Sequence, residues 1–374
     1  MQFIDLKKQY EVLQGEIDAN IAKVLQDGHY IGGAEVKQLS QELADYCGVK
    51  HCLTCANGTD ALTIALRCIG VGKGDAVFVP TFTFFASAET PALEGATCIF
   101  VDVNERTFNM DSEKLEKAIR QVIAQGKLTP KCIIAVDLFG QPADYPAIRK
   151  VADAYGLPII EDGAQGFGGS INGKKACSFG DISTTSFFPA KPLGCYGDGG
   201  AIFTDNDAYY ELMCSLAVHG KGGYKYDNVR IGYNSRLDTL QAAILLPKLD
   251  AFRRYELQAR DEIAKKYTAL LQDHFVTPLV PDTFGSSWAQ YTLILDSPEQ
   301  RDQMQQKLKE KGIPTMVYYP IPMHKQSAFA GYAFKLSDLQ TAERLCQVVM
   351  SIPMHPYLTD EQIAMIAQTL IESK

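Results

Sequence analysis

Between residues 50 and 164, short segments typical of β-strands alternate with longer segments typical of α-helices. Such alternation predicts a largely parallel sheet with helices on both faces, because parallel strands need a crossover connection to reach their neighbours. The fold class expected is therefore α/β. The strands are expected at 50–56, 75–80, 97–103, 131–140 and 157–164, and the helices at 58–70, 85–96 (interrupted by Pro91), 112–126 and 145–156.

Helical spacing of apolar residues also precedes and follows this region. Helices are expected at 10–26 and 34–47, separated by the glycine-containing stretch 28–33. After residue 240 the pattern predicts long helices with Pro247 at a kink or boundary, a strand at 288–295, and helices at 298–312 and near 338–350. Because 374 residues are many for one core, we predict a large domain at 1–245 and a smaller C-terminal α+β domain at 246–374.

The charge balance narrows the classes of partner. The net charge is −8 and the pI is about 5.4, which argues against nucleic acid or an anionic membrane as the main partner. No segment has the ~18–20 uninterrupted apolar residues of a membrane span, and the charged N-terminal segment does not resemble a secretory signal. We therefore expect a cytoplasmic protein.

The ten cysteines are scattered, mostly within apolar runs, as expected for buried reduced thiols. Cys52 and Cys55 have CxxC spacing, but only His51 is nearby as a further zinc ligand. Two small residues in a buried strand is the favoured interpretation, and no metal site is expected.

In a parallel α/β sheet, ligands bind at the carboxyl ends of the strands. After the strand at 50–56, Gly58 and Thr59 open a helix whose free N–H groups suit a phosphate. An ordinary well-capped helix is the alternative. Phe84 follows the strand at 75–80, where it could stack on a flat ring, although core packing is the commoner fate of phenylalanine.

Asp162 and Lys191 are the candidates for catalysis. A carboxylate that ends an apolar strand needs a partner, and the protonated ring nitrogen of pyridoxal phosphate is one. A helix cap, a salt bridge or a turn would also explain Asp162. Lys191, between Pro189 and Pro192, could attack an aldehyde to form a Schiff base, although most lysines are solvated surface charges.

The order and spacing of these residues resemble fold-type-I pyridoxal-phosphate enzymes, and more specifically the DegT/DnrJ/EryC1/StrS sugar aminotransferase family. The matching stretches span nearly the whole chain. They are ANGTDAL, PTFTFFAS, VDLFGQPAD, PIIEDGAQGFG, SFFPAKPLGCYGDGGAIFT, the HG of AVHGKGG, RIGYNSRLDTLQAAIL, YYPIPMHKQ and SIPMHPYL.

The resemblance implies a role for each matching residue. Lys191 should bond covalently to pyridoxal 5'-phosphate, with pyridoxamine 5'-phosphate as the intermediate form, and Asp162 should pair with the ring nitrogen. Gln165 should lie near the 3-hydroxyl, and Phe84 should stack on the ring. Gly58, Thr59 and Ser186 should hold the phosphate, and Asn234 should reach it across a homodimer interface, so that two subunits share each site.

The resemblance also implies amino transfer from L-glutamate to a nucleotide-linked keto sugar for surface polysaccharide (O-antigen) synthesis. The likeness is greatest to enzymes that aminate the 3-keto position of a UDP-linked N-acetyl hexuronic acid. Arg230 could bind the uronate carboxylate or form an intersubunit salt bridge. His219 and His324 line the substrate cleft in the family, or are structural histidines.

Four alternatives stay open or are disfavoured. Tyr319 and His324 depart from the uronate subgroup, which keeps a dTDP-linked 3- or 4-keto-6-deoxy hexose as the second candidate substrate. A regulatory, non-catalytic relative is disfavoured because Lys191 and Asp162 are both present, and Lys191 also argues against the family's dehydratase branch, which has histidine there. A Rossmann-type nucleotide enzyme would need GxGxxG after the first strand, which the chain lacks.

Overall fold

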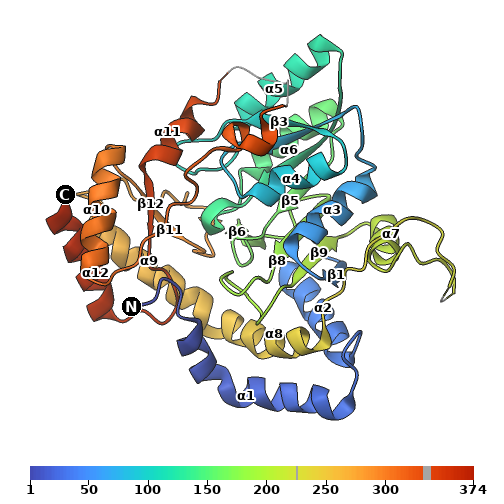
Figure 1. The fold of residues 1–374 in the computed structure, drawn as a ribbon, viewed down its shortest axis with the longest axis horizontal. Coiled ribbons are helices and arrows are strands. Elements are labelled where there is room, and N and C mark those ends of the chain that lie inside the picture. Colours follow the sequence, from blue (N-terminus) through green and yellow to red (C-terminus); the bar gives the residue numbers. More distant parts are fainter. Residues whose placement is uncertain (225, 332–337) are drawn as a thin grey trace.

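The computed structural model describes residues 1–224, 226–331 and 338–374 (Figure 1). Its centre is a seven-stranded sheet in the order β1-β9-β8-β5-β4-β2-β3. Only β9 runs antiparallel to its neighbours, so the sheet is mostly parallel. The α/β fold class is therefore confirmed. The strands of this sheet are β1 His51–Cys55, β2 Asp75–Pro80, β3 Thr97–Val101, β4 Thr129–Val136, β5 Ile159–Asp162, β8 Ile182–Ser186 and β9 Gly200–Thr204.

Helices cover both faces of this sheet because its strands are apolar on both sides. Val77 and Val79 of β2 pack in one core with α3 and α4, whereas Ala76 and Phe78 pack in another with α5 and α6. α7 joins the first face, and α2 with α8 cover the end of the sheet near β1 and β9. These helices are α2 Ala34–Cys47, α3 Gly58–Ile69, α4 Phe85–Leu93, α5 Ser112–Gln125, α6 Tyr145–Tyr155, α7 Asp207–Ala217 and α8 Thr239–Ala251.

A separate apolar core is built entirely from residues after 260. It packs the two-stranded sheet β11–β12 against α9, α10 and α12, which lie together on the left of Figure 1. Other C-terminal segments, including Met323 and Phe329, pack instead against the core of the large sheet. The remaining elements are α1 Leu6–Asp27, η1 Leu138–Gly140, β6 Ser170–Ile171, β7 Lys174–Lys175, η2 Phe252–Glu256, α9 Leu257–Leu271, β10 Phe284–Gly285, β11 Tyr291–Ile294, α10 Pro298–Glu310, η3 Met323–Lys325, η4 Ser327–Phe329, α11 Gln340–Val348, β12 Val349–Ile352 and α12 Asp360–Ser373.

The order of elements predicted for residues 10–164 is confirmed, and several boundaries are corrected. The strand expected at 131–140 ends at Val136, because the chain turns into η1, where Phe139 has φ of +60°. The helix expected near 338–350 ends at Val348 and continues as β12, which pairs with β11. No prediction covered β8, β9 or α12.

Pro247 does not end its helix. α8 continues past it to Ala251, a π-helical turn follows at η2, and α9 continues from there. The predicted domain boundary at 245/246 thus falls inside α8, and the division into two domains stays a prediction. Within the described residues, none of the helices combines the length and apolar character needed to cross a membrane.

Candidate active site

Asp162 ends β5 with its carboxyl group buried at the carboxyl edge of the sheet. Ser87 Oγ, from α4, donates a 2.7 Å hydrogen bond to Oδ2, and the Ala164 N–H donates one of 3.2 Å to Oδ1. Burial raises the pKa of Asp162, because the charged form loses its hydration. A cationic group held against this carboxylate would offset that cost. The position therefore suits a protonated ring nitrogen.

Lys191 lies in the loop between β8 and β9. Its backbone N–H donates a 2.9 Å hydrogen bond to the Phe188 carbonyl oxygen, and the Phe188 N–H donates one of 3.2 Å to Ser186 Oγ. Burial lowers the pKa of Lys191, and the negative charge of Asp162 acts in the opposite direction. The structure thus brings the Lys191 amine close enough to Asp162 for their charges to interact. A lowered pKa makes the neutral, nucleophilic amine easier to form.

The N-terminus of α3 packs directly against the end of β8. A Cβ added at Gly58 would lie 2.8 Å from Ser186 Cβ, so only glycine allows this approach. Asn57 caps the helix by accepting from the Asp60 N–H at 2.8 Å. Within the described residues, the backbone N–H groups of Gly58 and Thr59 form no hydrogen bond. Together with Ser186 Oγ they make a cradle that fits a phosphate group.

Tyr319, Gln165 and Phe84 form a cluster near Asp162, whose charge acts on the Tyr319 hydroxyl. Gln165 Nε2 donates a 3.1 Å hydrogen bond to Tyr319 OH, and the Tyr319 ring lies 6.1 Å from the ring of Phe84. Gln165 is itself held by the Phe139 N–H, which donates to its Oε1 at 2.6 Å. Phe84 is 54% exposed, so its ring is available for stacking. Phe84, Gln165 and Tyr319 thus surround the space next to Asp162.

His219, Arg230 and Asn234 lie on a projecting segment, the arm, formed by residues 218–224 and 226–234. Its two sides are joined by hydrogen bonds such as that from the His219 N–H to the Tyr233 carbonyl oxygen (2.7 Å). Figure 1 shows the arm extending beyond α7, away from β5 and β8. Arg230 donates to Ser215 Oγ, and Asn234 Oδ1 accepts from Arg236. No described contact joins the arm to Asp162 or Lys191 of the same chain.

His324 is bonded through both ring nitrogens. Nδ1 lies 2.7 Å from Thr81 Oγ1, and Nε2 lies 3.0 Å from Glu343 Oε1. Lys325 also pairs with Glu343, at 2.7 Å. These contacts favour the structural interpretation of His324, and its role toward substrate stays a prediction.

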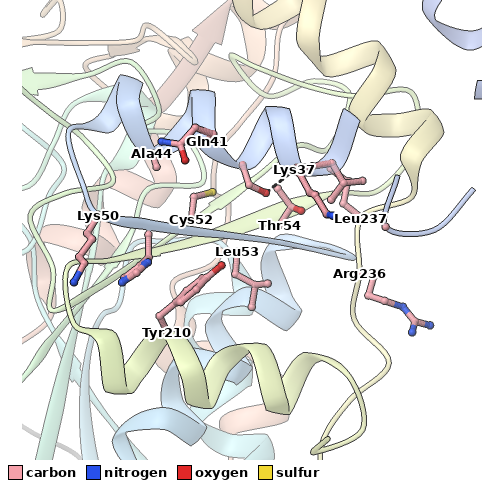
Figure 2. A pocket seen from close by; sticks show the side chains of 14 residues that line it. Lys37, Gln41, Ala44, Lys50, Cys52, Leu53, Thr54, Tyr210, Arg236 and Leu237 are labelled. Atoms are coloured by element: carbon pink, nitrogen blue, oxygen red, sulfur yellow. Dashed lines mark hydrogen bonds between the residues drawn. The ribbon is translucent and has the colours of Figure 1, made fainter. Parts of the chain in front are cut away.

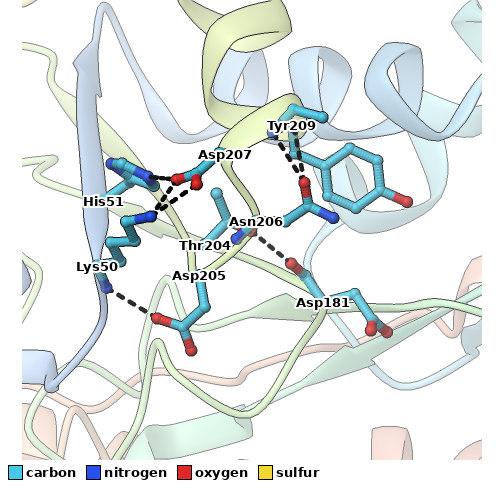
Figure 3. Close-up of polar contacts among 9 residues, drawn as sticks. Lys50, His51, Asp181, Thr204, Asp205, Asn206, Asp207 and Tyr209 are labelled. Atoms are coloured by element: carbon cyan, nitrogen blue, oxygen red, sulfur yellow. Dashed lines mark hydrogen bonds and ion pairs between the residues drawn. The ribbon is translucent and has the colours of Figure 1, made fainter.

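A pocket of about 350 Å³ lies elsewhere, between α2, β1 and α7 (Figure 2). Lys50 and Arg236 stand at its opposite ends. Figure 3 shows that Lys50 and His51 both reach Asp207, and the His51 ring stacks on Tyr210 with centroids 4.2 Å apart. Lys50 and His51, two of the basic residues that line this pocket, are therefore paired within the chain. Asp162 does not line the pocket.

Ser87 contacts Asp162 but was not predicted as a site residue. Its only sequence signal is its position one helical turn after Phe84.

Cys52 and Cys55 are buried on opposite faces of β1, in different cores, so they cannot bind one zinc ion together. Among the described residues, no three His, Cys, Asp or Glu side chains are arranged to hold a metal ion.

Comparison with known proteins places this geometry in a family. The model of the DegT/DnrJ/EryC1/StrS aminotransferase family matches residues 11–371. The chain is 47% identical, over 99% of both chains, to the UDP-2-acetamido-2-deoxy-3-oxo-D-glucuronate aminotransferase of Pseudomonas aeruginosa. It is 42% identical to a "pleiotropic regulatory protein" of Geobacillus stearothermophilus, over 99% of this chain and 97% of the relative.

Solved structures agree with the family assignment. An aminotransferase of this family from Brucella abortus superposes with a TM-score of 0.96 at 46% identity, covering 99% of this chain and 98% of that one. DesV of S. venezuelae, solved with a ketimine intermediate, gives 0.92 at 35% identity, covering 99% and 97%. A sugar aminotransferase of Streptococcus pneumoniae, solved in its PLP form, gives 0.88 at 26% identity and 96% coverage of both chains. The chain therefore belongs to the DegT/DnrJ/EryC1/StrS family of pyridoxal-phosphate-dependent sugar aminotransferases.

Proposed function

We propose that this chain transfers an amino group from L-glutamate to the 3-keto position of a UDP-linked N-acetyl hexuronic acid. The observation that carries the proposal is the Lys191–Asp162 arrangement in a chain 47% identical, over 99% of its length, to an aminotransferase named for such a substrate. The product would be a precursor of surface polysaccharide such as O-antigen. A cytoplasmic location is supported by the ten free cysteines, since reduced thiols persist there.

The residues fit pyridoxal phosphate at each of its recognisable parts. The α3 N-terminus, Gly58, Thr59 and Ser186 would hold the phosphate, and Asp162 would face the ring nitrogen. Phe84 would stack on the ring, and Gln165 would lie near the 3-hydroxyl. When bound, the cofactor supplies an aldehyde and an electron sink for the carbon that loses its proton.

Lys191 has two tasks in this proposal. Its amine would attach to the aldehyde of the cofactor until the amino group of glutamate takes its place, and burial favours the neutral form that this attachment needs. When free, the Lys191 Nζ would remove the proton from the α-carbon of the donor, and in the second half-reaction it would deliver a proton to the sugar carbon that carried the keto oxygen. Asp162, which accepts a hydrogen bond from Ser87, would keep a negative charge next to the ring nitrogen of the cofactor during both half-reactions.

We propose that the active unit is a homodimer. Asn234, His219 and Arg230 would act from the arm of one subunit on the site of the other, with Arg230 binding the uronate carboxylate. Two observations support this: the arm extends away from the site of its own chain, and it exposes large apolar side chains. A monomer would then be inactive.

A dTDP-linked 3- or 4-keto-6-deoxy hexose is the second candidate substrate. It is favoured by a 36% identical relative, the dTDP-3-amino-3,4,6-trideoxy-alpha-D-glucose transaminase of Streptomyces venezuelae, which matches 99% of this chain. A purely regulatory role, as named for the Geobacillus stearothermophilus relative, is less well supported because Lys191 and Asp162 are both present.

A panel of nucleotide-linked keto sugars, offered with glutamate and the cofactor, tests these alternatives. We expect the UDP-linked 3-keto uronate to give the 3-amino product, identified by mass spectrometry and NMR, with 2-oxoglutarate formed in equal amount. Turnover of the dTDP-linked 6-deoxy sugars alone would transfer the assignment to the second candidate. A protein that neither binds pyridoxal phosphate nor converts any member of the panel would contradict both.

A further inference from the structure

Behind the candidate site, two fully buried carboxyl groups lie on the other face of the sheet. In the parallel pair β4–β5, Ala135 lies opposite Glu161, and Asp137 follows Ala135 by two residues, so Asp137 and Glu161 share a face. A Cβ added at Gly163 would lie 3.8 Å from Asp137 Oδ2 and 2.8 Å from Cys177 Sγ. Asp162, between Glu161 and Gly163, points instead toward Ser87.

Glu161 is surrounded by hydrogen-bond donors. Its Oε1 accepts from the Cys177 N–H at 2.5 Å, and its Oε2 accepts from the Phe179 N–H and Ser183 Oγ, both at 2.7 Å. The Gly180 N–H adds a longer bond of 3.2 Å. Burial raises the pKa of Glu161, and these donors act in the opposite direction because they stabilise the carboxylate anion.

Asp137 has a different environment. Its Oδ1 accepts from Tyr145 OH at 2.8 Å and from the Ala143 N–H at 3.0 Å. Its Oδ2 is buried and has no donor among the described residues. Two carboxylates cannot donate to each other, but a proton on Oδ2 would let Asp137 donate to Glu161 and satisfy this atom. Burial raises the pKa of Asp137 well above its ordinary value, and the charge of Glu161 adds to the effect.

The other titratable groups facing Asp137 are Tyr145 from α6 and Cys177 from the turn before β8. Burial raises the pKa of both, so both are neutral near pH 7. With a proton on Asp137, the buried group as a whole would carry one negative charge, on Glu161.

Asp137 also supports the turn that carries two candidate cofactor residues. Its N–H donates to the Asp162 carbonyl oxygen at 3.1 Å. Gly166 packs on its side chain so closely that an added Cβ would lie 2.4 Å from Asp137 Cβ. Gln165 directly precedes Gly166, and the turn from 162 to 166 joins it to Asp162. A change in the Asp137 side chain would therefore act on Gln165 through Gly166, and on Asp162 through this turn.

We propose that Asp137 and Glu161 share one proton, carried by Asp137, and that this neutral carboxyl is a positioning residue for Asp162 and Gln165. The location of the proton is independent of what the enzyme acts on. The positioning role rests on the proposed function, because it assumes that Asp162 and Gln165 contact the cofactor.

Isotope-edited infrared spectroscopy of the cofactor-free wild-type protein locates the proton. We expect the carbonyl stretch of a protonated carboxylic acid at neutral pH that shifts with ¹³C-labelled aspartate and not with ¹³C-labelled glutamate. The band should persist in Asp162→Asn and disappear in Asp137→Asn. A missing band, a band that shifts with labelled glutamate, or a band lost in Asp162→Asn would overturn the proposal.

Conservative variants test the positioning role. Asp137→Asn can still accept from Tyr145 and donate to Glu161, so cofactor affinity and kcat should stay within about threefold of wild type. Asp137→Ala, which cannot donate, and Glu161→Gln, whose NH₂ would face N–H donors, should each weaken cofactor binding about tenfold or more. Equal losses in Asp137→Asn and Asp137→Ala, or a tolerated Glu161→Gln, would contradict it.

The location of the proton and the proposed function can be contradicted by different results. If the wild-type protein does not bind pyridoxal phosphate, the proposed function fails while the infrared result still decides where the proton lies. If the variants do not fold, the wild-type spectra, with the Asp162→Asn control, still confirm or overturn the shared proton.

Discussion

The site around Asp162 and the arm that carries Arg230 are built in opposite ways. Asp162 is 5% exposed and is held by hydrogen bonds from Ser87 and the following turn. The arm is held mainly by its own backbone, and Ile231 within it is 82% exposed. One region is fixed by the fold of a single chain, and the other presents apolar surface to its surroundings.

This difference separates the parts of the reaction that one chain supplies from those that a second copy would supply. Covalent binding and proton transfer need fixed geometry, which burial and several packed elements provide. Large apolar side chains that are exposed together are typical of an interface, and the arm exposes Tyr224, Val229 and Ile231. The contrast supports the proposal that the arm completes the site of a partner subunit.

The largest effect should come from Lys191→Ala, which tests the rigid side of the comparison. On the roles proposed for Lys191, the variant would lack both the covalent link to the cofactor and the base for the α-proton, so turnover should fall by roughly 10³-fold or more. The measurements are kcat with the best sugar of the panel and the visible absorbance of the lysine-bound cofactor. Lys127→Ala, at an exposed lysine, is the control and should keep both.

Ile231→Asp tests the arm side. Placing a charge in an apolar contact should weaken subunit association by about 30-fold, equivalent to roughly 2 kcal/mol, and lower activity in the same proportion at low concentration. Analytical ultracentrifugation and activity over a dilution series measure the two effects. Met365→Asp is the matched control, because Met365 is an exposed apolar residue on α12. Full activity in a monomeric Ile231→Asp protein would contradict a shared site.

Arg230→Ala sharpens the comparison by asking what the arm recognises. Loss of a charge-assisted contact should lower kcat/KM for the uronate about tenfold, while a 6-deoxy sugar, which lacks the carboxylate, should be little affected. Equal losses on both sugars would leave Arg230 as an intersubunit or structural residue. Lys127→Ala, at an exposed lysine between α5 and β4, is the control for a general loss of positive charge.

Lys248→Met should have the smallest effect on activity. Lys248 is a buried residue of α8 that packs against Tyr196, in the same loop as Lys191. Burial lowers the pKa of Lys248 to about 8, and its amine lies 4.7 Å from the centre of the Tyr196 ring. Between pH 8 and 10.5 the unfolded chain holds the Lys248 proton more strongly than the folded chain. The free energy of unfolding should therefore rise with pH over this window, by roughly 3 kcal/mol from this residue.

Urea unfolding at the two ends of this pH window measures the effect. Other groups also titrate there, so the quantity to compare is the pH-dependent change in wild type minus that in Lys248→Met. The free energy of unfolding should rise more with pH in wild type than in Lys248→Met, and Lys127→Met should show the same rise as wild type. An identical pH dependence in wild type and Lys248→Met would contradict a buried, low-pKa lysine.

Sequence patterns succeeded where one period dominated a long segment and failed where tertiary contacts decided. The helix α5 and the strand β2 have clear apolar periods and were predicted nearly to the residue. β8 was not predicted, because Ser183, Thr184 and Thr185 are polar residues that become buried only when β5 and β9 pair with them. Pro247 was expected to mark a kink or a boundary, and the structure corrects only the boundary, because α8 continues past it to Ala251.

The sequence by itself determined the α/β class, the family, and the residues expected to hold the cofactor, because these depend on local periodicity and on motifs with fixed spacing. The tertiary structure decided which groups meet. The hydrogen bonds from Ser87 to Asp162 and from Gln165 to Tyr319, and the burial of Asp137 beside Glu161, all join residues from different elements. Burial and hydrogen bonding set the charge of such groups, and neither exists until distant segments pack together.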